Sequence, residues 1–199
     1  MLNKIVLASN NAGKLQEFNQ LLAPLQYQLL PQAQLGVSDV DEPHPTFIEN
    51  CLTKARNAAQ ITGLPALADD SGLCVAALNG APGVRSARYA GDSNATTRDA
   101  SNNARLIATL QGHGHRQAWY YCALVYLRHA NDPQPLIAEG IWHGSIIDIP
   151  RGAGGFGYDA HFYLPDLDKT AAELSTADKN RFSHRGLAMQ TLLRRLSSP

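Results

Sequence analysis

The sequence predicts a single α/β unit, and three observations support this prediction. Its 199 residues are enough for one ample hydrophobic core, or for one core with a smaller lobe attached, but too few for two full-sized independent domains. Hydrophobic residues make up 44% of the chain and charged residues 17%, which is the composition of an ordinary globular protein. Short apolar runs typical of strands also alternate with segments of helical periodicity. Residues 1–199 are therefore expected to form one domain.

Charge and cysteine content exclude several classes of protein. The 17 basic and 17 acidic side chains balance, which argues against a broad nucleic-acid-binding face but allows a local basic pocket. No targeting segment is expected from the first residues, and no apolar stretch reaches the roughly 18 residues that could cross a bilayer. Cys51, Cys74 and Cys122 are widely spaced in apolar surroundings, so we expect reduced core thiols. A soluble cytoplasmic protein without nucleic-acid or membrane partners is expected.

The first expected elements are a strand, a loop and a helix. KIVLAS at residues 4–9 has the character of a short strand, and it ends in the polar segment SNNAGK. Apolar residues then recur at helical spacing, namely Leu15, Phe18, Leu21, Leu22 and Leu25. YQLLP at residues 27–31 is predicted to be a second short strand. The chain thus begins with the alternation of strand and helix that an α/β fold requires.

An acidic loop and a capped helix follow. The stretch SDVDEPHPT at residues 38–46 is broken by prolines and is predicted to be a loop. Thr46 is expected to cap the next helix, with Glu49 completing a capping box. The helix is predicted to stop near Gly63 and Pro65.

The middle of the chain is predicted from its breaks and turns. Residues 66–78, ALADDSGLCVAAL, suggest two short apolar runs separated by a carboxylate-rich break. Asn79-Gly80 and Pro82-Gly83 are typical turn pairs. A third helix is expected at about 97–110, ending at Gly112. This helix would lead into the longest apolar run of the chain.

The last third predicts two strands and a terminal helix. Residues 116–129 carry apolar side chains in both alternation phases, which predicts a strand covered on both faces. Residues 136–148 contain two glycines and are predicted to form a bent or bulged partner strand. The C-terminal helix has a predicted inner stripe of Leu187, Leu192, Leu193 and Leu196.

A phosphate-binding loop is one interpretation of Gly13-Lys14. A lysine at a strand-to-helix junction brings backbone N–H groups, a helix N-terminus and a cation together, which suits phosphate. A Walker motif is excluded because Leu15 follows the lysine and Ala8 stands where that motif requires glycine. The alternative is that Asn11 caps the helix and Lys14 is solvated.

Adjacent carboxylates give a second candidate site. Asp69 and Asp70 lie at the end of a short apolar run, and side chains adjacent on an extended backbone point in opposite directions. One carboxylate can therefore face a cavity while the other stabilises the turn or binds a basic partner, and the same logic applies to Asp41 and Glu42. Carboxylates from two loops near a phosphate site would bind Mg²⁺. The alternative is an ordinary Asx turn at ADDSG.

Aromatic and basic residues near the C-terminus suggest a base-binding region. Glycines between residues 152 and 157 allow close backbone approach, and Phe156 offers a face on which a base can stack. His184 and Arg185 add donors suited to carbonyl oxygens or phosphate. The alternatives are ordinary packing of the aromatic side chains and a polar helix start at Ser183.

Taken together, these stretches resemble the inosine triphosphate pyrophosphatase family, also called the Ham1 or RdgB-like family of noncanonical purine NTP pyrophosphatases. The resemblance covers nearly the whole chain, and six motifs occur in the family's order. They are SNNAGK at 9–14, TFIENCLTKA at 46–55, ADDSG at 68–72, GAPGVRSARYAG at 80–91, GGFGYD at 154–159 and the KTAAEL…K…SHRG arrangement ending at Gly186.

This resemblance implies a fold and an activity. The implied fold is an elongated mixed α/β sheet with flanking helices and two lobes around a central substrate cleft. The implied reaction hydrolyses ITP, dITP and XTP to the nucleoside monophosphate and pyrophosphate. It depends on Mg²⁺, and the implied assembly is a homodimer.

The resemblance also implies roles for individual residues. Asp70 would be the proton acceptor and a metal ligand, and Glu42 would be a further metal ligand. Lys54 is a weaker candidate for binding phosphate. The triphosphate would be held by Ser9, Asn10, Asn11, Ala12, Gly13 and Lys14. Other substrate contacts would come from Ser71, Phe156, Gly157, Tyr158, Asp159, Lys179, His184 and Arg185, although Tyr158 has a structural alternative.

Chemistry supports these roles without excluding two rival functions. Attack of water at the α-phosphorus needs charge neutralisation, which Mg²⁺, Lys14 and Lys54 would supply, while Asp70 would deprotonate the water. A donor such as Arg185 would favour a 6-oxo purine over adenine. The rivals are a non-catalytic nucleotide-binding or sensing module and an NTP pyrophosphatase of broader base specificity.

Overall fold

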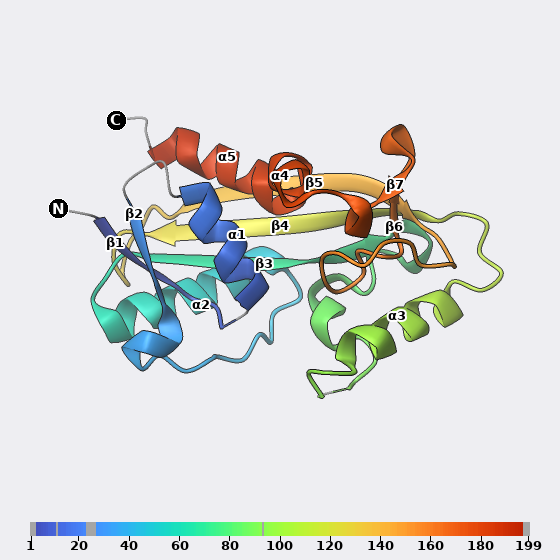
Figure 1. The fold of residues 1–199 in the computed structure, drawn as a ribbon. Helices are drawn as coiled ribbons and strands as arrows, with labels where there is room; N and C mark the ends of the chain where they lie inside the picture. The colour runs from blue at the N-terminus through green and yellow to red at the C-terminus, as the bar shows by residue number, and fades with distance from the viewer. Residues whose placement is uncertain (1–2, 11, 23–26, 93, 197–199) are drawn as a thin grey trace. The chain divides into compact units, whose positions relative to one another are not determined.

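The computed structural model describes residues 3–10, 12–22, 27–92 and 94–196 (Figure 1). Its strands form one mixed sheet in the order β2-β1-β3-β4-β5-β6-β7. β1 is parallel to β2 and β3, whereas β6 is antiparallel to β5 and β7. The strand bounds are Asn3–Leu7 for β1, Tyr27–Pro31 for β2, Ala66–Val75 for β3, Gln117–Leu127 for β4, Leu136–Ile146 for β5, Phe162–Leu164 for β6 and Lys169–Thr170 for β7. The predicted mixed sheet with flanking helices is confirmed.

The chain divides into two compact units. Unit 1 comprises residues 1–70, 122–140 and 185–199, and unit 2 comprises residues 71–121 and 141–184. Strands β3, β4 and β5 contribute residues to both units. The helices are α1 (Ala12–Leu22), α2 (Phe47–Thr62), α3 (Arg98–Thr109), α4 (Thr176–Phe182) and α5 (His184–Leu196).

The core of unit 1 lies between its strands and two of its helices. Buried side chains of α1 and α5, including Phe18 and Met189, pack on Ile5 and Leu7 of β1. In Figure 1, α2 lies on the opposite side of these strands from α1 and α5. Since residues alternate between the faces of a strand, β1 can supply both packing surfaces.

Helix α2 has the ends that its sequence predicts. Thr46 is the N-cap, and its side chain accepts a hydrogen bond from the Glu49 backbone N–H. Gly63 closes the helix with φ +66°, a left-handed conformation that glycine adopts without steric cost. Small buried side chains, among them Ala55 and Ala58, form the inner face. The Glu49 carboxylate accepts a hydrogen bond from the Thr46 hydroxyl group and not from the Thr46 backbone N–H, so the predicted capping box is not completed. The Thr46 N-cap and the terminal glycine mark the two ends of α2.

Strand β3 corrects one expectation. The predicted break at ADDSG is absent, because Ala66–Val75 is one continuous strand in which Asp69 and Asp70 are buried. The Asx-turn alternative is therefore wrong. Lysines pair with both carboxylates, so the strand continues through them without leaving an isolated buried charge.

Other expectations are refined by the structure. Helix α5 buries Ala188, Met189 and Leu192, whereas Leu187 is only half-buried. Leu25 and Asn11 lie outside the described residues, and so does the side chain of Leu21. The predicted helix at 97–110 is confirmed as α3, and the predicted strands at 116–129 and 136–148 are confirmed as β4 and β5.

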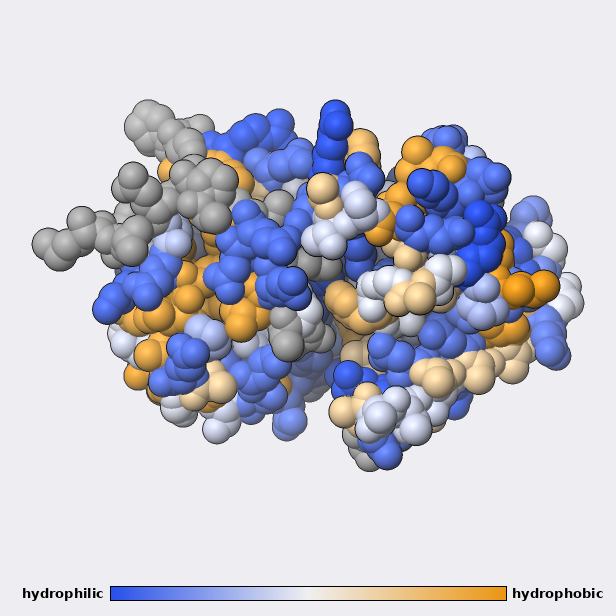
Figure 2. All heavy atoms as spheres, viewed as in Figure 1, coloured by the Kyte–Doolittle hydropathy of each residue, from blue (hydrophilic) through white to orange (hydrophobic). Residues whose placement is uncertain are grey.

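The cysteines and the surface also bear on the sequence analysis. Cys51, Cys74 and Cys122 are free and buried, as predicted. Figure 2 shows hydrophilic side chains spread over one face, with hydrophobic groups between them. Within the described ranges, no helix combines the length and apolar character that a membrane span requires.

Candidate active site

The candidate site residues fall into two clusters, one in each unit. Asp69 and Asp70 belong to the first cluster and are adjacent on β3. Adjacent side chains on an extended strand project to opposite faces, so the two carboxylates meet different cations. Lys14 of α1 pairs with Asp69, and Lys54 of α2 pairs with Asp70. A basic partner was predicted for one of the two carboxylates, and the structure gives one to each.

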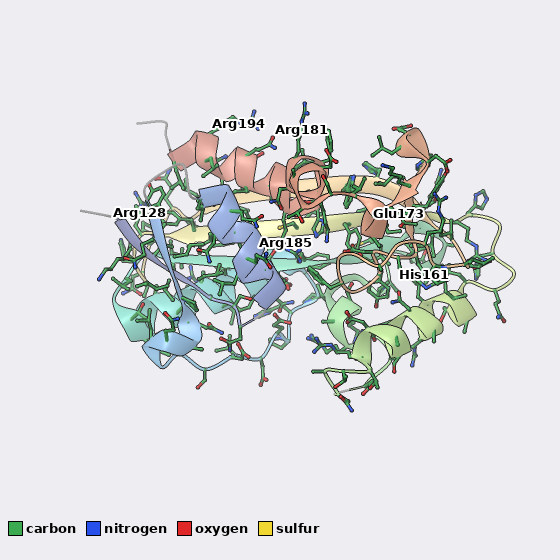
Figure 3. The ribbon with its side chains drawn as sticks, in the orientation of Figure 1. Arg128, His161, Glu173, Arg181, Arg185 and Arg194 are labelled. Carbon is green, nitrogen blue, oxygen red and sulfur yellow. The ribbon has the colours of Figure 1, made fainter. Side chains whose placement is uncertain are left out.

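Asp69 is the centre of a buried ion-pair network. Its side chain contacts the Lys14 ammonium group, and its Oδ2 lies 3.5 Å from Nε of Arg185. The Cys122 thiol donates a hydrogen bond to the same oxygen at 3.2 Å. Burial alone would raise the pKa of Asp69, but Lys14 and Arg185 outweigh it and hold the pKa well below its ordinary value. Asp69 is therefore a fixed negative charge that orients two cations. Figure 3 shows one of them, Arg185, beside α1.

Asp70 has a different electrostatic environment. Its Oδ1 lies 3.2 Å from Nζ of Lys54, while its buried Oδ2 has no hydrogen-bond partner among the residues that the structure describes. Burial raises the pKa of this carboxyl group to about 6, against the opposing effect of Lys54 and with a contribution from Glu42. A carboxylate with such a pKa is a stronger base than an ordinary aspartate, and one of its oxygens is available for a ligand.

Lys54 links the two acidic segments. Its Nζ donates to Oε1 of Glu42 at 2.7 Å and to Asp70 at 3.2 Å. Burial disfavours its charged form, yet Asp70 and Glu42 raise the pKa of Lys54, so it stays an ammonium ion. The lysine therefore holds both carboxylates near one point of unit 1.

A buried amide positions the acidic loop. Oδ1 of Asn50 accepts the His44 backbone N–H at 2.9 Å, and Nδ2 of Asn50 donates to the His44 carbonyl at 3.1 Å. Asn50 is fully buried in α2, one helical turn before Lys54. The backbone two residues after Glu42 is thus pinned to the helix that carries its lysine partner. Sequence reasoning missed Asn50, although an amide on the buried face of a helix was a visible signal.

The first loop is joined to the acidic loop. Nδ2 of Asn10 donates to Oδ1 of Asp39 at 2.9 Å, and Gln32 donates to the same oxygen at 2.6 Å. Ser9 is half-buried, and Gly13 and Lys14 lie in the first turn of α1. Asn11, which the sequence places in this loop, lies outside the described residues. The last of the residues predicted to bind phosphate therefore form the N-terminal turn of a helix, where backbone N–H groups favour anions.

Residues of unit 1 also fit a divalent cation. Magnesium commonly uses one or two protein carboxylates and takes its remaining ligands from substrate phosphates and water. Glu42 and Asp70, both bound to Lys54, provide such a pair, and Oδ2 of Asp70 is available. In the described ranges, no group of three or more His, Cys, Asp or Glu side chains is arranged to hold a metal ion. This pair of carboxylates suits a metal site in which the substrate supplies further ligands.

The second cluster surrounds Phe156 in unit 2. Phe156 is 37% exposed, and Nζ of Lys179 lies 4.8 Å from its ring centroid. Oδ2 of Asp159 accepts from Lys179 at 2.7 Å and from the Phe156 backbone N–H at 3.0 Å. The buried Tyr158 donates its hydroxyl hydrogen to the Ser86 carbonyl at 2.8 Å. Among these residues, Phe156 presents the accessible aromatic face.

His184 rests on an aromatic stack that the sequence analysis did not identify. Its ring is stacked on Tyr120, with centroids 4.7 Å apart and an interplanar angle of 10°. Trp142 extends the stack, whereas the Phe162 ring is tilted by 55° against that of Tyr120. Tyr120 also donates to Oδ1 of Asp159 at 3.3 Å. The three consecutive aromatic residues at 119–121 in β4 were the available signal. His184 belongs to unit 2, whereas its chain neighbour Arg185 belongs to unit 1; Asp70 and Ser71 are divided in the same way.

The fold and these clusters define an α/β protein with adjacent carboxylates, half-buried lysines that pair with them, and a group of aromatic residues. Comparison with known proteins identifies the family within this class, because residues 5–195 match the Ham1 family. The chain belongs to that family, which confirms the resemblance seen in its motifs.

Relatives match along almost their whole length. A dITP/XTP pyrophosphatase of Ralstonia nicotianae is 62% identical, and the alignment covers 98% of this chain and 97% of the relative. A dITP/XTP pyrophosphatase of Nitrosomonas europaea is 59% identical, covering 98% and 95%. The structure of a HAM1 protein from Coxiella burnetii has a TM-score of 0.91 at 47% identity, with 98% of each chain covered.

Proposed function

We propose that this protein is a nucleoside triphosphate pyrophosphatase that hydrolyses ITP, dITP and XTP. Water attacks the α-phosphorus, the bond from that phosphorus to the bridging oxygen breaks, and the nucleoside monophosphate and pyrophosphate form. The names of its relatives, dITP/XTP pyrophosphatases at 59–62% identity, support this substrate class. The reaction would remove noncanonical purine nucleotides from the nucleotide pool.

The environment of Asp70 carries the proposal. Its pKa is raised to about 6 by burial, and its Oδ2 has no hydrogen-bond partner in the described part of the chain. At neutral pH the carboxylate is ionised and can accept the proton of the attacking water. Lys54 fixes the other oxygen and thereby the orientation of the base. The Asp69 carboxylate has no oxygen available in this way, because its oxygens already contact Lys14, Arg185 and Cys122.

The basic residues of unit 1 would bind the triphosphate. Lys14 lies in the first turn of α1, where the helix N-terminus favours negative charge. The segment from Ser9 to Lys14 would follow the phosphates, and Lys54 would neutralise the charge that develops during attack. Asp69 keeps Lys14 in place without neutralising the whole basic cluster, since Arg185 contacts the same carboxylate.

Glu42 and Asp70 would hold Mg²⁺ together with the substrate. When bound, this ion would supply Lewis-acid charge neutralisation on the phosphate oxygens. Asn50 keeps the acidic loop on α2 through the His44 backbone, so Glu42 is held near Lys54. The protein would therefore hold both carboxylates in position before the substrate binds.

The base would be recognised by the residues near the C-terminus. Phe156 offers the stacking face, and Lys179 lies against its ring. His184 and Arg185 supply donors for a 6-oxo purine, whereas adenine would leave a donor unsatisfied. Ser71, Gly157, Tyr158 and Asp159 complete the proposed contacts. For Tyr158 and Asp159, internal hydrogen bonds favour a supporting contribution.

Product analysis tests the proposal directly. The protein is incubated with ITP and Mg²⁺, and IMP and pyrophosphate are expected in equal amounts. Binding of ITP without release of pyrophosphate would support the rival nucleotide-binding or sensing module. Comparison of kcat/KM for ITP, XTP, GTP, ATP and dUTP separates the second rival, since equal values for ITP and GTP would indicate broader base specificity.

Assembly and location follow from the same proposal. We expect a homodimer in the cytoplasm, where nucleoside triphosphates are used, with small-molecule partners rather than nucleic acid or membranes. The equal numbers of basic and acidic residues fit a protein without a nucleic-acid-binding face. Sedimentation velocity measures the assembly, and a monomer at all concentrations would contradict the expected dimer.

A further inference from the structure

The segment from Phe156 to Asp159 combines an exposed aromatic residue with a backbone that several hydrogen bonds hold in place. Asp159 accepts the Phe156 N–H, and Lys179 binds the same carboxylate oxygen. Tyr158 is buried and donates to the Ser86 carbonyl. The Phe156 backbone is thus held in place, while more than a third of the residue stays exposed.

Helix α3 supplies the remaining anchor, at Gly157. Oδ2 of Asp99 accepts the Gly157 N–H at 2.7 Å, and Nδ2 of Asn103 donates to the Gly157 carbonyl at 2.9 Å. Asp99 and Asn103 are four residues apart in α3, so they share one face of the helix. Both backbone polar groups of Gly157 are therefore bound by one helix that is more than 50 residues away in the chain.

The conformation of Gly157 explains why such a clamp is useful. Its φ is +64°, a region that glycine enters readily and also leaves readily. A glycine beside the stacking residue would otherwise let Phe156 sample several orientations, and ordering it would cost binding free energy. Two hydrogen bonds to a helix remove that freedom before the base arrives.

We propose that Asp99 and Asn103 are positioning residues for base binding, acting through Gly157 to pre-orient the ring of Phe156. The proposal deepens the proposed function and rests on it, because it takes Phe156 as the stacking face for the purine. Neither side chain contacts the base in this account. Their contribution is to hold one peptide unit in one orientation.

Kinetics of single variants give the first test. Asn103→Ala and Asp99→Ala should each raise KM for ITP about threefold to tenfold, the loss expected for one hydrogen bond, while kcat stays within about twofold. Asp99→Asn retains an acceptor oxygen and should recover most of the lost affinity. Gln111→Ala removes an exposed amide just beyond α3 and is the matched control. Loss of kcat with unchanged KM would overturn the proposal.

Inorganic tripolyphosphate separates base positioning from general damage. This inhibitor has no base, so its inhibition constant should be the same for Asn103→Ala and for the unmodified protein. A parallel weakening of ITP and tripolyphosphate would show that the variant disturbs the whole fold, and would contradict a positioning contribution.

A double-mutant cycle tests the route through Phe156. In a Phe156→Ala background the stacking face is gone, so adding Asn103→Ala should raise KM by less than about 1.5-fold. Fully additive effects of the two substitutions would overturn the proposal, because Asn103 would then act by another path.

Hydrogen exchange tests the clamp without using activity. The Gly157 amide should exchange about threefold to tenfold faster in Asp99→Ala, and its rate should recover in Asp99→Asn. Unchanged exchange would overturn the clamp even if the protein hydrolyses ITP. Faster exchange in a protein that releases no pyrophosphate from ITP would instead refute the proposed function and leave the clamp intact.

Discussion

Nζ of Lys54 lies 3.2 Å from Oδ1 of Asp70, while Oδ2 of the same carboxylate is buried with no hydrogen-bond partner among the described residues. The lysine thus orients the carboxylate and leaves one oxygen for a ligand. Lys54 also binds Glu42, and burial raises the pKa of Asp70 to about 6 despite the nearby ammonium group. This pairing would provide an oriented base for the proposed reaction.

Replacement of the bridging lysine should slow the reaction. Lys54→Met leaves Glu42 and Asp70 close together without their shared cation, so kcat/KM for ITP should fall by about 10²-fold. Lys54→Arg keeps the charge and should lose less. Arg56→Met changes an exposed basic residue on the same helix and serves as the control. Steady-state kinetics measure all three, and near-normal kcat/KM in Lys54→Met would remove the lysine from catalysis.

Asp70→Asn should separate binding from turnover. The amide has the shape of the carboxylate but accepts no proton, so we expect kcat to fall by about 10²- to 10⁴-fold. Nucleotide binding, measured by calorimetry with ITP, should persist. If kcat of this variant is close to that of the unmodified protein, Asp70 is not the proton acceptor.

Removal of the stacking face should weaken the binding of all the purine bases to a similar extent. Phe156→Ala loses a base contact of about 1–3 kcal/mol, which corresponds to a rise in KM of roughly 5- to 150-fold. The ratio of KM values between ITP and XTP should change little, because stacking tolerates any base. Phe182→Ala removes another exposed phenylalanine and provides the control. A loss confined to one base would mean that Phe156 shapes the pocket for a particular base edge.

Stability should depend on pH through Asp132 in unit 1. This 1%-exposed carboxylate accepts hydrogen bonds from the Arg128 guanidinium group and from the backbone N–H groups of Arg128 and Gln134, all of which hold its pKa well below the ordinary value. Asp132→Asn should lower the free energy of unfolding by about 1–3 kcal/mol at pH 7.

The sign of this pH dependence follows from the lowered pKa. A carboxylate with a depressed folded-state pKa stabilises the protein above its unfolded pKa of about 3.9, and the contribution is lost as pH falls through that value towards the folded pKa. Urea unfolding should therefore show the difference from Asp132→Asn shrinking below about pH 5. Exposed Asp166→Asn should show no such trend, and a difference that grows in acid would contradict this account.

Local features of the fold could be predicted from the sequence. Thr46, Glu49 and Gly63 carry their capping signals within a few residues, and α2 has the ends that these signals indicate. The predicted break in β3 was wrong because the partners that neutralise its carboxylates, Lys14 and Lys54, are distant in the chain. Pattern reasoning treats an aspartate pair as a break unless such partners are known.

The candidate site could be predicted as a set of residues but not as a set of contacts. Its motifs indicated the family, which comparison confirms. The assigned contacts stay predictions, as does the expectation that residues 1–199 form one domain. The pairing of Asn50 with His44 and the clamp of α3 on Gly157 join segments by hydrogen bonds that depend on the folded backbone. No periodicity or spacing encodes such contacts.

Hydrolysis of ITP in ¹⁸O-labelled water, with mass analysis of both products, tests the central claim most directly. If Asp70 activates water for attack on the α-phosphorus, one ¹⁸O atom enters IMP and none enters pyrophosphate. Label in pyrophosphate, or IDP and inorganic phosphate as products, would place the attack on another phosphorus atom and contradict the proposed reaction.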